Sequence, residues 1–276
     1  MTNLLSSLII KRRSSVRTLL KGAIAISIVG LFVLASCGKD ELSIGRENPD
    51  LEIQKCVRLS AKKKFEQAIE CLQIFKSKFP KSQYGIDAEL KIADNYFDQR
   101  EFELAADTYM AFTRLYPYDP KLDYAFYRAG LSYYNTTPKS IARDQEYLDD
   151  AADLFRMVMQ NFPGSAYFNL AAASLRDAQE KIARRNFYVG RFYYRTGEFI
   201  AAAPRFLTVL DEYPHTTILE RSLYFLTKVD IKLGNLEEAK KAYSELVTRF
   251  PKSKYSKKLE HKLIAAAEKA QKKTEE

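Results

Sequence analysis

Apolar residues recur at helical spacing along most of the chain, and five stretches of this pattern end with an aromatic residue followed by proline. Twelve residues before each proline lies an alanine, and three residues before each alanine lies a large apolar residue. Because proline ends a helix, the pattern predicts five repeated units that each finish with an amphipathic helix. The five endings are Phe79-Pro80, Tyr116-Pro117, Phe162-Pro163, Tyr213-Pro214 and Phe250-Pro251. The apolar residues and alanines are Phe65 and Ala68, Phe102 and Ala105, Leu148 and Ala151, Phe199 and Ala202, and Leu236 and Ala239.

A residue of the type that caps a helix N-terminus stands two positions after each proline and predicts where the next helix begins. These residues are Ser82, Asp119, Ser165, Thr216 and Ser253. Small residues precede the alanines of units one, two and four by twelve positions (Cys56, Ala93, Gly190), and tyrosine follows them in units two and four. This order of small residue, tyrosine, aromatic residue, alanine and proline resembles the tetratricopeptide repeat. It predicts an all-α fold, a tetratricopeptide-repeat α-solenoid of five helical hairpins with a capping helix over 253–272.

Three departures from a regular repeat have structural consequences. The third unit carries extra residues, Asn135 to Glu146, which predict a long loop within its hairpin. Between Ser165 and Arg195 the only helix breaker is Gly190, so we expect one helix of about 30 residues that divides the solenoid into two lobes. Pro204 lies in the second helix of unit four and predicts a late start or a kink there.

The N-terminus has the pattern of an export signal. Residues 1–36 carry five basic and no acidic residues, and an apolar run from Ala23 to Leu34 ends at Leu34-Ala35-Ser36-Cys37. This ending resembles the lipobox of bacterial lipoproteins, which implies cleavage before Cys37 and covalent acyl chains on that residue. An ordinary signal peptide or membrane anchor with an incidental cysteine is the alternative.

The predicted organisation has five parts. They are a lipoprotein signal peptide (1–36), a lipidated linker (37–47), an N-terminal lobe with repeats one to three (48–165), a C-terminal lobe with repeats four and five and the bridging helix (166–260), and a Lys-rich helical tail (261–276).

The net charge of +9 does not indicate nucleic-acid binding. Five of the positive charges lie in the signal, and residues 252–276 hold eight Lys against four Glu. The rest of the chain is electrically neutral and lacks a face that would follow phosphates. The tail is either a solvated helix end or a contact with anionic lipid headgroups.

No catalytic or metal-binding motif is present. The chain has only two His and three Cys, and it lacks a Gly-rich phosphate loop and the HExxH, GxSxG and Cys-x-x-Cys patterns. We therefore expect no catalytic residue, no metal site and no cofactor beyond the acyl chains on Cys37. Cys56 and Cys71 fall on opposite helices of the first hairpin, where a disulfide is possible but two small core residues are the favoured interpretation.

The anchor, the short linker, the five repeats, the insertion and the long helix together resemble the BamD (YfiO-like) family of outer-membrane assembly lipoproteins, over roughly residues 34–260. The resemblance implies a non-enzymatic subunit of the β-barrel assembly machine, anchored by lipid in the outer membrane and facing the periplasm. Its implied partners are a POTRA domain of BamA, other subunits of the complex, and unfolded β-barrel proteins that end in an aromatic residue. Arg205 matches the position where the family places an arginine that pairs with an acid of BamA; a solvated surface arginine is the alternative.

A solenoid of helical hairpins presents a groove lined by first helices, which suits extended peptides. The residues expected to face it in repeats two and three are Asp94, Phe97, Tyr124, Tyr127 and Tyr134. The alternative is that some of these aromatic side chains are core. Among other functions, an adaptor in another cell-envelope or glycan-uptake system remains open. An enzyme would need a catalytic domain, and outside the signal no stretch without repeats exceeds about 30 residues.

Overall fold

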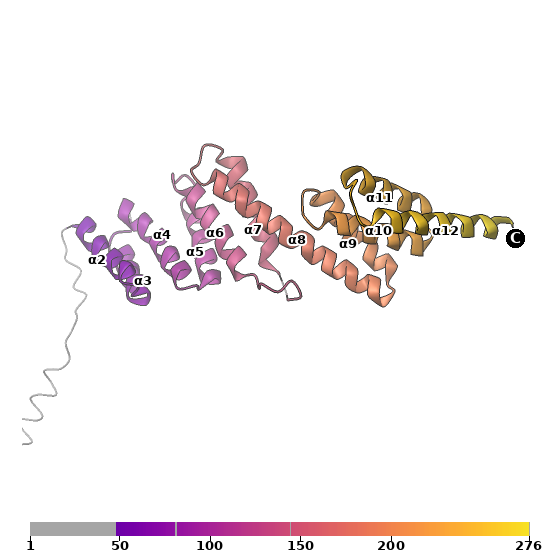
Figure 1. The fold of residues 1–276 in the computed structure, drawn as a ribbon. Coiled ribbons are helices and arrows are strands. Elements are labelled where there is room, and N and C mark those ends of the chain that lie inside the picture. Colours follow the sequence, from indigo (N-terminus) through magenta and orange to yellow (C-terminus); the bar gives the residue numbers. More distant parts are fainter. Residues whose placement is uncertain (1–47, 81, 144, 276) are drawn as a thin grey trace, which may run out of the picture. The chain divides into compact units, whose positions relative to one another are not determined.

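The predicted repeats form pairs of helices that follow one another along the chain (Figure 1). The computed structural model describes residues 48–80, 82–143 and 145–275, and these ranges contain eleven helices and no strand. The helices are α2 (Pro49–Ala61), α3 (Phe65–Lys78), α4 (Gln83–Asp98), α5 (Phe102–Leu115), α6 (Leu122–Thr136), α7 (Tyr147–Asn161), α8 (Phe168–Thr196), α9 (Phe199–Glu212), α10 (Leu219–Leu233), α11 (Leu236–Arg249) and α12 (Ser256–Glu275). The predicted signal 1–36, Cys37 and the linker 37–47 lie outside the described residues.

The second helix of every repeat ends where the aromatic–proline pair predicts. Phe79 is the C-cap of α3, with φ −126° and ψ 50°, and its N–H donates to the carbonyl of Phe75 at 3.0 Å. The aromatic residues before the other four prolines cap α5, α7, α9 and α11 in nearly the same conformation. A residue before proline avoids the helical conformation, so the pair fixes the end of the helix.

The first helices begin as predicted in only one repeat. Ser82 caps α4, and its Oγ accepts a hydrogen bond from the N–H of Gly85 at 2.9 Å. At the other four sites the helix begins three residues after the expected cap. There the polar residue holds a preceding turn instead: Asp119 Oδ1 accepts from the N–H of Lys121 at 2.8 Å, and Ser165 Oγ from that of Tyr167 at 2.9 Å. The predicted helix start was wrong by this one turn.

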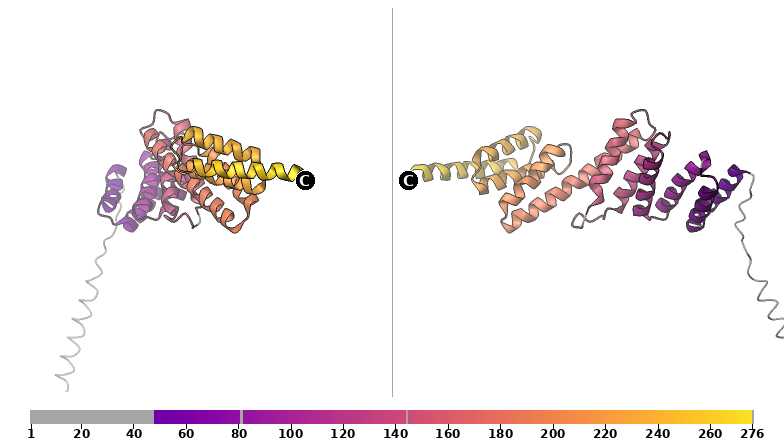
Figure 2. Two further views of the ribbon diagram at one scale, coloured as in Figure 1. Left: turned by 45° about the vertical axis from the view of Figure 1, so that its right-hand side comes forward. Right: turned by 180° about the vertical axis from the view of Figure 1, so that it is seen from behind.

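Small residues allow adjacent helices to pack closely. The five repeat alanines are completely buried, and each helix from α2 to α12 packs against the next, as the views in Figure 2 also show. A Cβ atom added to Gly190 would lie 2.8 Å from the ring of Phe206, and one added to Gly130 would lie 2.9 Å from that of Phe155. Gly130 and Gly190 occupy the small-residue position of repeats three and four. A larger residue there would collide with the aromatic ring of the second helix, which explains why the repeat carries a small residue at this position.

The long bridging helix is confirmed. The 29 residues of α8 are continuous and pack against α7 near their start and against α9 near their end. Residues 137–143, 145 and 146 lie in the long connection between α6 and α7. The second helix of repeat four does not start late, because α9 begins at Phe199 and contains Pro204. The capping helix α12 packs on α10 and α11 and continues across the expected boundary at 260 and 261. The division into two lobes remains a prediction.

The first hairpin contains a disulfide that the sequence analysis did not favour. Cys56 of α2 and Cys71 of α3 are bonded, with an S–S distance of 2.00 Å, and both are buried. The two small residues bring their Cα atoms to 5.4 Å, which is within the range that a disulfide needs. The expectation of two unlinked core cysteines was therefore wrong. Of the helices described, none combines the length and apolarity needed to cross a membrane.

Candidate functional site

Asp94 of α4 is the centre of a polar cluster between repeats two and three. The hydroxyls of Tyr109 and Tyr124 both donate to Asp94 Oδ1, and Arg128 Nη2 lies 3.7 Å from the same oxygen. Burial raises the pKa of both tyrosines, and the negative charge of Asp94 raises it further. Both hydroxyls therefore remain protonated donors at physiological pH.

Arg128 connects this cluster to Phe97. Its guanidinium lies 3.9 Å from the centre of the Phe97 ring, and its Nε donates to the hydroxyl of Tyr109 at 3.0 Å. Cation–π and hydrogen-bond contacts thus occupy one face of Phe97 and the hydroxyls of the tyrosines. A ligand that binds beside the cluster would contact the edges of the aromatic rings, because the polar atoms of Asp94, Arg128 and the tyrosines already have partners within the protein.

A pocket of about 310 Å³ lies beside the cluster, between α4, α6 and the turn before α8. Its walls include the rings of Tyr124 and Tyr167, whose centres are 5.4 Å apart. Lys121 pairs with Asp87 at the rim, and Asp123 accepts a hydrogen bond from Ser165 Oγ at 2.6 Å; these three charged side chains and Asp94 also line the pocket.

Lys91 of α4 lines the same pocket and differs from its neighbours. Its ammonium makes no hydrogen bond or ion pair with any other residue of the described ranges. The pocket therefore combines two aromatic walls with one unpaired positive charge, which is an arrangement that can hold a carboxylate next to an apolar group.

Four of the five predicted groove residues lie around this pocket. Asp94, Phe97 and Tyr124 belong to the cluster, and the ring of Tyr127 stacks on that of Tyr167 with 5.4 Å between centres. Tyr134 is placed differently, since the ammonium of Lys181 lies 3.6 Å from the centre of its ring. The four tyrosine and phenylalanine side chains are half-buried, so each packs partly in the core and leaves part of its surface exposed.

The sequence analysis missed the residues that hold the cluster together, Tyr109, Arg128 and Tyr167, and it also missed Lys91. Arg128 had a detectable signal, because it lies four residues after Tyr124 and therefore on the same face of α6. Tyr109 lies on a second helix and Tyr167 in an inter-repeat turn, whereas the predicted groove residues all lie on first helices.

Arg205 is exposed on α9 and contacts α8. Its Nη1 donates to Asn186 Oδ1 at 3.5 Å, and its Cβ lies 3.2 Å from the position of a Cβ on Gly190. No described carboxylate pairs with it. The apolar side chains of Ile200 and Leu207 are also exposed on α9, at 81% and 42%.

No three His, Cys, Asp or Glu side chains in the described part of the chain are grouped so that they could hold a metal ion. Of the acidic residues near the pocket, Asp87 pairs with Lys121 and Asp94 with Arg128, and Asp123 accepts a hydrogen bond from Ser165.

Comparison with known proteins assigns the chain to a family. The family model described as "Outer membrane lipoprotein" (YfiO) matches residues 54–244. The outer membrane protein assembly factor BamD of Rickettsia prowazekii is 30% identical over 233 residues, which cover 84% of this chain and 92% of the relative. BamD of Neisseria meningitidis serogroup A is 30% identical over 200 residues, which cover 69% and 75%. The TPR2AB domain of yeast Sti1 is 16% identical, with a TM-score of 0.38 and coverage of 81% and 86%, a likeness too low to carry a functional argument. The chain belongs to the YfiO family of outer membrane lipoproteins, and its role is in the assembly of outer membrane proteins.

Proposed function

We propose that this protein is a lipid-anchored scaffold of the β-barrel assembly machine, held in the outer membrane by acyl chains on Cys37 and facing the periplasm. It binds BamA through the C-terminal repeats and the C-terminal segments of unfolded barrel proteins through the N-terminal repeats. The observation that carries the proposal is the pocket beside Asp94, in which the unpaired Lys91 and Tyr124 lie on first helices of a repeat fold and Tyr167 lies in the turn before α8.

The location is supported by two independent features of the chain. The Leu34-Ala35-Ser36-Cys37 ending fits lipid attachment at Cys37, in agreement with the description of the family. The Cys56–Cys71 disulfide fits an oxidising compartment such as the periplasm, since disulfides are rare where thiols are kept reduced.

The charges around the pocket favour the C-terminus of a peptide as the ligand. Asp87 and Asp94 are already paired with Lys121 and Arg128, and Asp123 accepts a hydrogen bond from Ser165 but pairs with no described cation. Lys91 is the lining cation that is available to a bound carboxylate. An aromatic side chain that precedes this carboxylate would pack on Tyr124 and Tyr167. A terminal aromatic residue with a free carboxylate has both features.

Binding of a fluorescent ten-residue peptide that ends in a free Phe carboxylate tests this site. We expect Lys91→Gln to weaken binding about five- to tenfold, because a charge-assisted contact is lost. The same substitution should not change binding of the C-terminally amidated peptide, which lacks the charge.

Lys139→Gln is the control, because Lys139 is exposed on the loop 137–146, away from the pocket. Equal affinities of the wild type and Lys91→Gln for the free-carboxylate peptide would show that the peptide does not use this pocket.

The partner contact on α9 is tested with the purified POTRA domains of BamA. Arg205→Lys keeps the charge but removes the planar fork that pairs with a carboxylate, so we expect affinity to fall about tenfold. Arg176→Lys, an exposed arginine of α8, should leave affinity unchanged. If the two variants bind equally well, Arg205 does not pair with an acid of BamA.

A further inference from the structure

A second pocket, of about 330 Å³, lies between α8 and α10, the first helices of repeats four and five. The insertion in the third repeat contributes to it through Ile141, which lines the pocket together with Phe187 and Tyr188 of α8. Three arginines complete the lining, Arg184 and Arg191 from α8 and Arg221 from α10, and no carboxylate of the described residues lines the pocket. The role proposed above uses neither this pocket nor the insertion.

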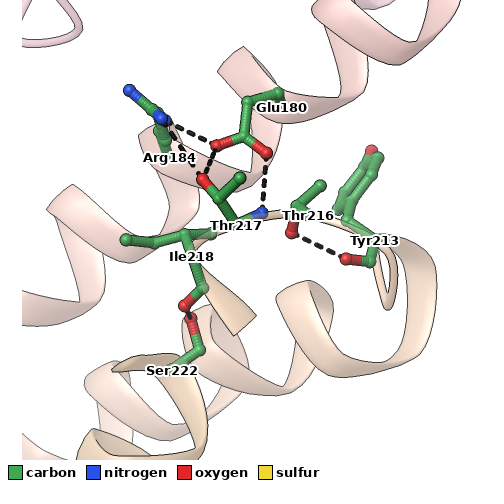
Figure 3. Close-up of polar contacts among 7 residues, drawn as sticks. All are labelled: Glu180, Arg184, Tyr213, Thr216, Thr217, Ile218 and Ser222. Atoms are coloured by element: carbon green, nitrogen blue, oxygen red, sulfur yellow. Dashed lines mark hydrogen bonds and ion pairs between the residues drawn. The ribbon is translucent and has the colours of Figure 1, made fainter. Parts of the chain in front are cut away.

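One wall of the pocket is fixed by Glu180 of α8 (Figure 3). Its carboxylate accepts hydrogen bonds from the N–H of Thr217 at 2.8 Å, from the hydroxyl of Thr217, and from Arg184 Nε at 2.7 Å. Burial acts to raise the pKa of Glu180, but these hydrogen bonds outweigh it and lower the pKa. Arg184 is thus neutralised, and the turn before α10 is held against α8.

The inserted loop is also held in place. The buried side chain of Gln145 donates to the carbonyls of Pro138 at 3.1 Å and Ser140 at 3.3 Å. Arg185 of α8 donates to the carbonyl of Gln145 at 3.3 Å. Ile141 therefore belongs to a loop that is held by hydrogen bonds within the loop and by a hydrogen bond from α8.

Arg191 and Arg221 carry positive charges that no described carboxylate neutralises. The guanidinium of Arg221 lies 4.7 Å from the centre of the Phe187 ring, and that of Arg191 lies 5.8 Å from it. Both guanidinium groups lie near the ring of Phe187, so cation–π contacts position them although neither forms an ion pair with a described carboxylate.

Exposed aromatic side chains extend the pocket along α8. Tyr188 is 50% exposed, and Phe192, one turn later, is 57% exposed. Tyrosine and arginine are the residue types enriched at the centres of protein interfaces. Tyr188 and Arg191 lie on the face of α8 opposite to Asn186 and Gly190, which Arg205 contacts, so this surface is separate from the Arg205 site.

We propose that this pocket binds an extended segment of a partner protein in which an acidic residue lies next to an aromatic or aliphatic residue. The carboxylate would bind between Arg191 and Arg221, and the apolar side chain would pack on Phe187, Tyr188 and Ile141. The pocket has room for one or two side chains, which fits a peptide better than the acyl chain of an anionic lipid.

A selection of peptides from a random heptapeptide library on the full chain tests the proposal. The Arg191→Gln/Arg221→Gln double variant serves for counter-selection, and it should fold normally because neither arginine has an ion pair to lose. We expect the peptides retained by the wild type alone to carry Asp or Glu beside an apolar residue. Each single substitution should then weaken binding of a selected peptide at least fivefold, whereas Arg176→Gln and Arg205→Ala should not change it.

Three results would overturn the proposal. The first is that the wild type and the double variant retain the same peptides. The second is that the retained peptides lack acidic residues. The third is that the double substitution abolishes binding to vesicles containing phosphatidylglycerol but leaves peptide binding unchanged, which would assign the arginines to a lipid surface. Thermal unfolding of the variants, with a midpoint within about 2 °C of the wild type, excludes misfolding as the cause of lost binding.

Discussion

Asp94 and Asp230 are aspartates of first helices with opposite surroundings. Asp94 accepts hydrogen bonds from two tyrosine hydroxyls and lies beside Arg128. Asp230 of α10 is buried and makes no side-chain hydrogen bond or ion pair within the described ranges. Its burial, and next the negative charge of Glu238, raise the pKa of Asp230 to about 6. It stands at the position where repeats two and four carry tyrosine, so repeat five holds a carboxyl group where those two repeats hold an aromatic ring.

We therefore expect Asp230→Asn to raise the free energy of unfolding at pH 8 by about 2 kcal/mol. The pKa of Asp230 is higher in the folded protein than the ordinary value of 3.8, so the folded state binds the proton more tightly than the unfolded chain. The wild type gains stability as the pH falls through 6 towards 4, and the advantage of the variant disappears over that range. Urea denaturation at pH 8, 6 and 4 measures this change.

Asp211→Asn is the control for this prediction, since Asp211 is exposed on α9. We expect it to leave the free energy of unfolding within about 0.5 kcal/mol of the wild type at each pH. An advantage of Asp230→Asn that does not depend on pH would contradict the assignment.

At the scale of the element, the turns within the hairpins share one backbone feature. Two residues before the second helix of repeats one, two, four and five, the chain has positive φ: 59° at Lys63, 68° at Arg100, 88° at Gly197 and 81° at Gly234. Glycine adopts this conformation without cost, whereas other residues are strained by roughly 1 kcal/mol. Repeats one and two carry that strain.

Arg100→Gly should therefore stabilise the protein by about 0.5 kcal/mol, because relief of the strain exceeds the added freedom of the unfolded chain. Gly234→Ala introduces the same strain in repeat five and should destabilise by about 1 kcal/mol. Arg100 is exposed, and its side chain has no hydrogen bond or ion pair to lose among the described residues. The two midpoints in urea should shift in opposite directions, and a shift in the same direction would contradict the argument.

The helices could be predicted from the sequence because their limits depend on local chemistry. The aromatic–proline pairs fixed the ends of the second helices, and the absence of breakers between Ser165 and Arg195 predicted α8. Three kinds of feature could not be obtained this way. The positive φ at Lys63 and Arg100 is not indicated by the type of residue at these positions. The extra turn before α6 depends on a hydrogen bond to Asp119, and an aspartate that caps a helix N-terminus would accept a similar bond. The disulfide depends on a distance between two helices.

The candidate site could be predicted only in part, because the sequence pattern places residues on single helices and does not give contacts between them. The repeat pattern predicted that Asp94, Phe97, Tyr124 and Tyr127 face one groove lined by first helices, and the structure brings the four residues close together, because the first helices of consecutive repeats lie side by side. It did not give their partners, since Tyr109 approaches from a second helix and Tyr167 from an inter-repeat turn. Contacts between residues of different helices and turns are set by packing. The spacing of residues along one helix does not predict them.

At the scale of the whole molecule, the protein distributes its candidate surfaces over different repeats. The pocket with Lys91 lies between repeats two and three, Arg205 lies on the second helix of repeat four, and the arginine pocket lies between repeats four and five. A repeat protein can carry several such sites because each repeat contacts mainly its neighbours. This arrangement suits the scaffold proposed above, which would hold a substrate segment and assembly partners at once.

We propose that the protein works as a scaffold within the β-barrel assembly machine. Affinity purification of the full-length, tagged chain from detergent-solubilised membranes, followed by identification of the proteins that co-purify, tests it most directly. We expect recovery of a BamA protein with POTRA domains from the wild type, and reduced recovery from Arg205→Ala but not from Arg176→Ala. Purification of the intact, membrane-bound wild type without any BamA would contradict the claim and would favour an adaptor of another envelope system.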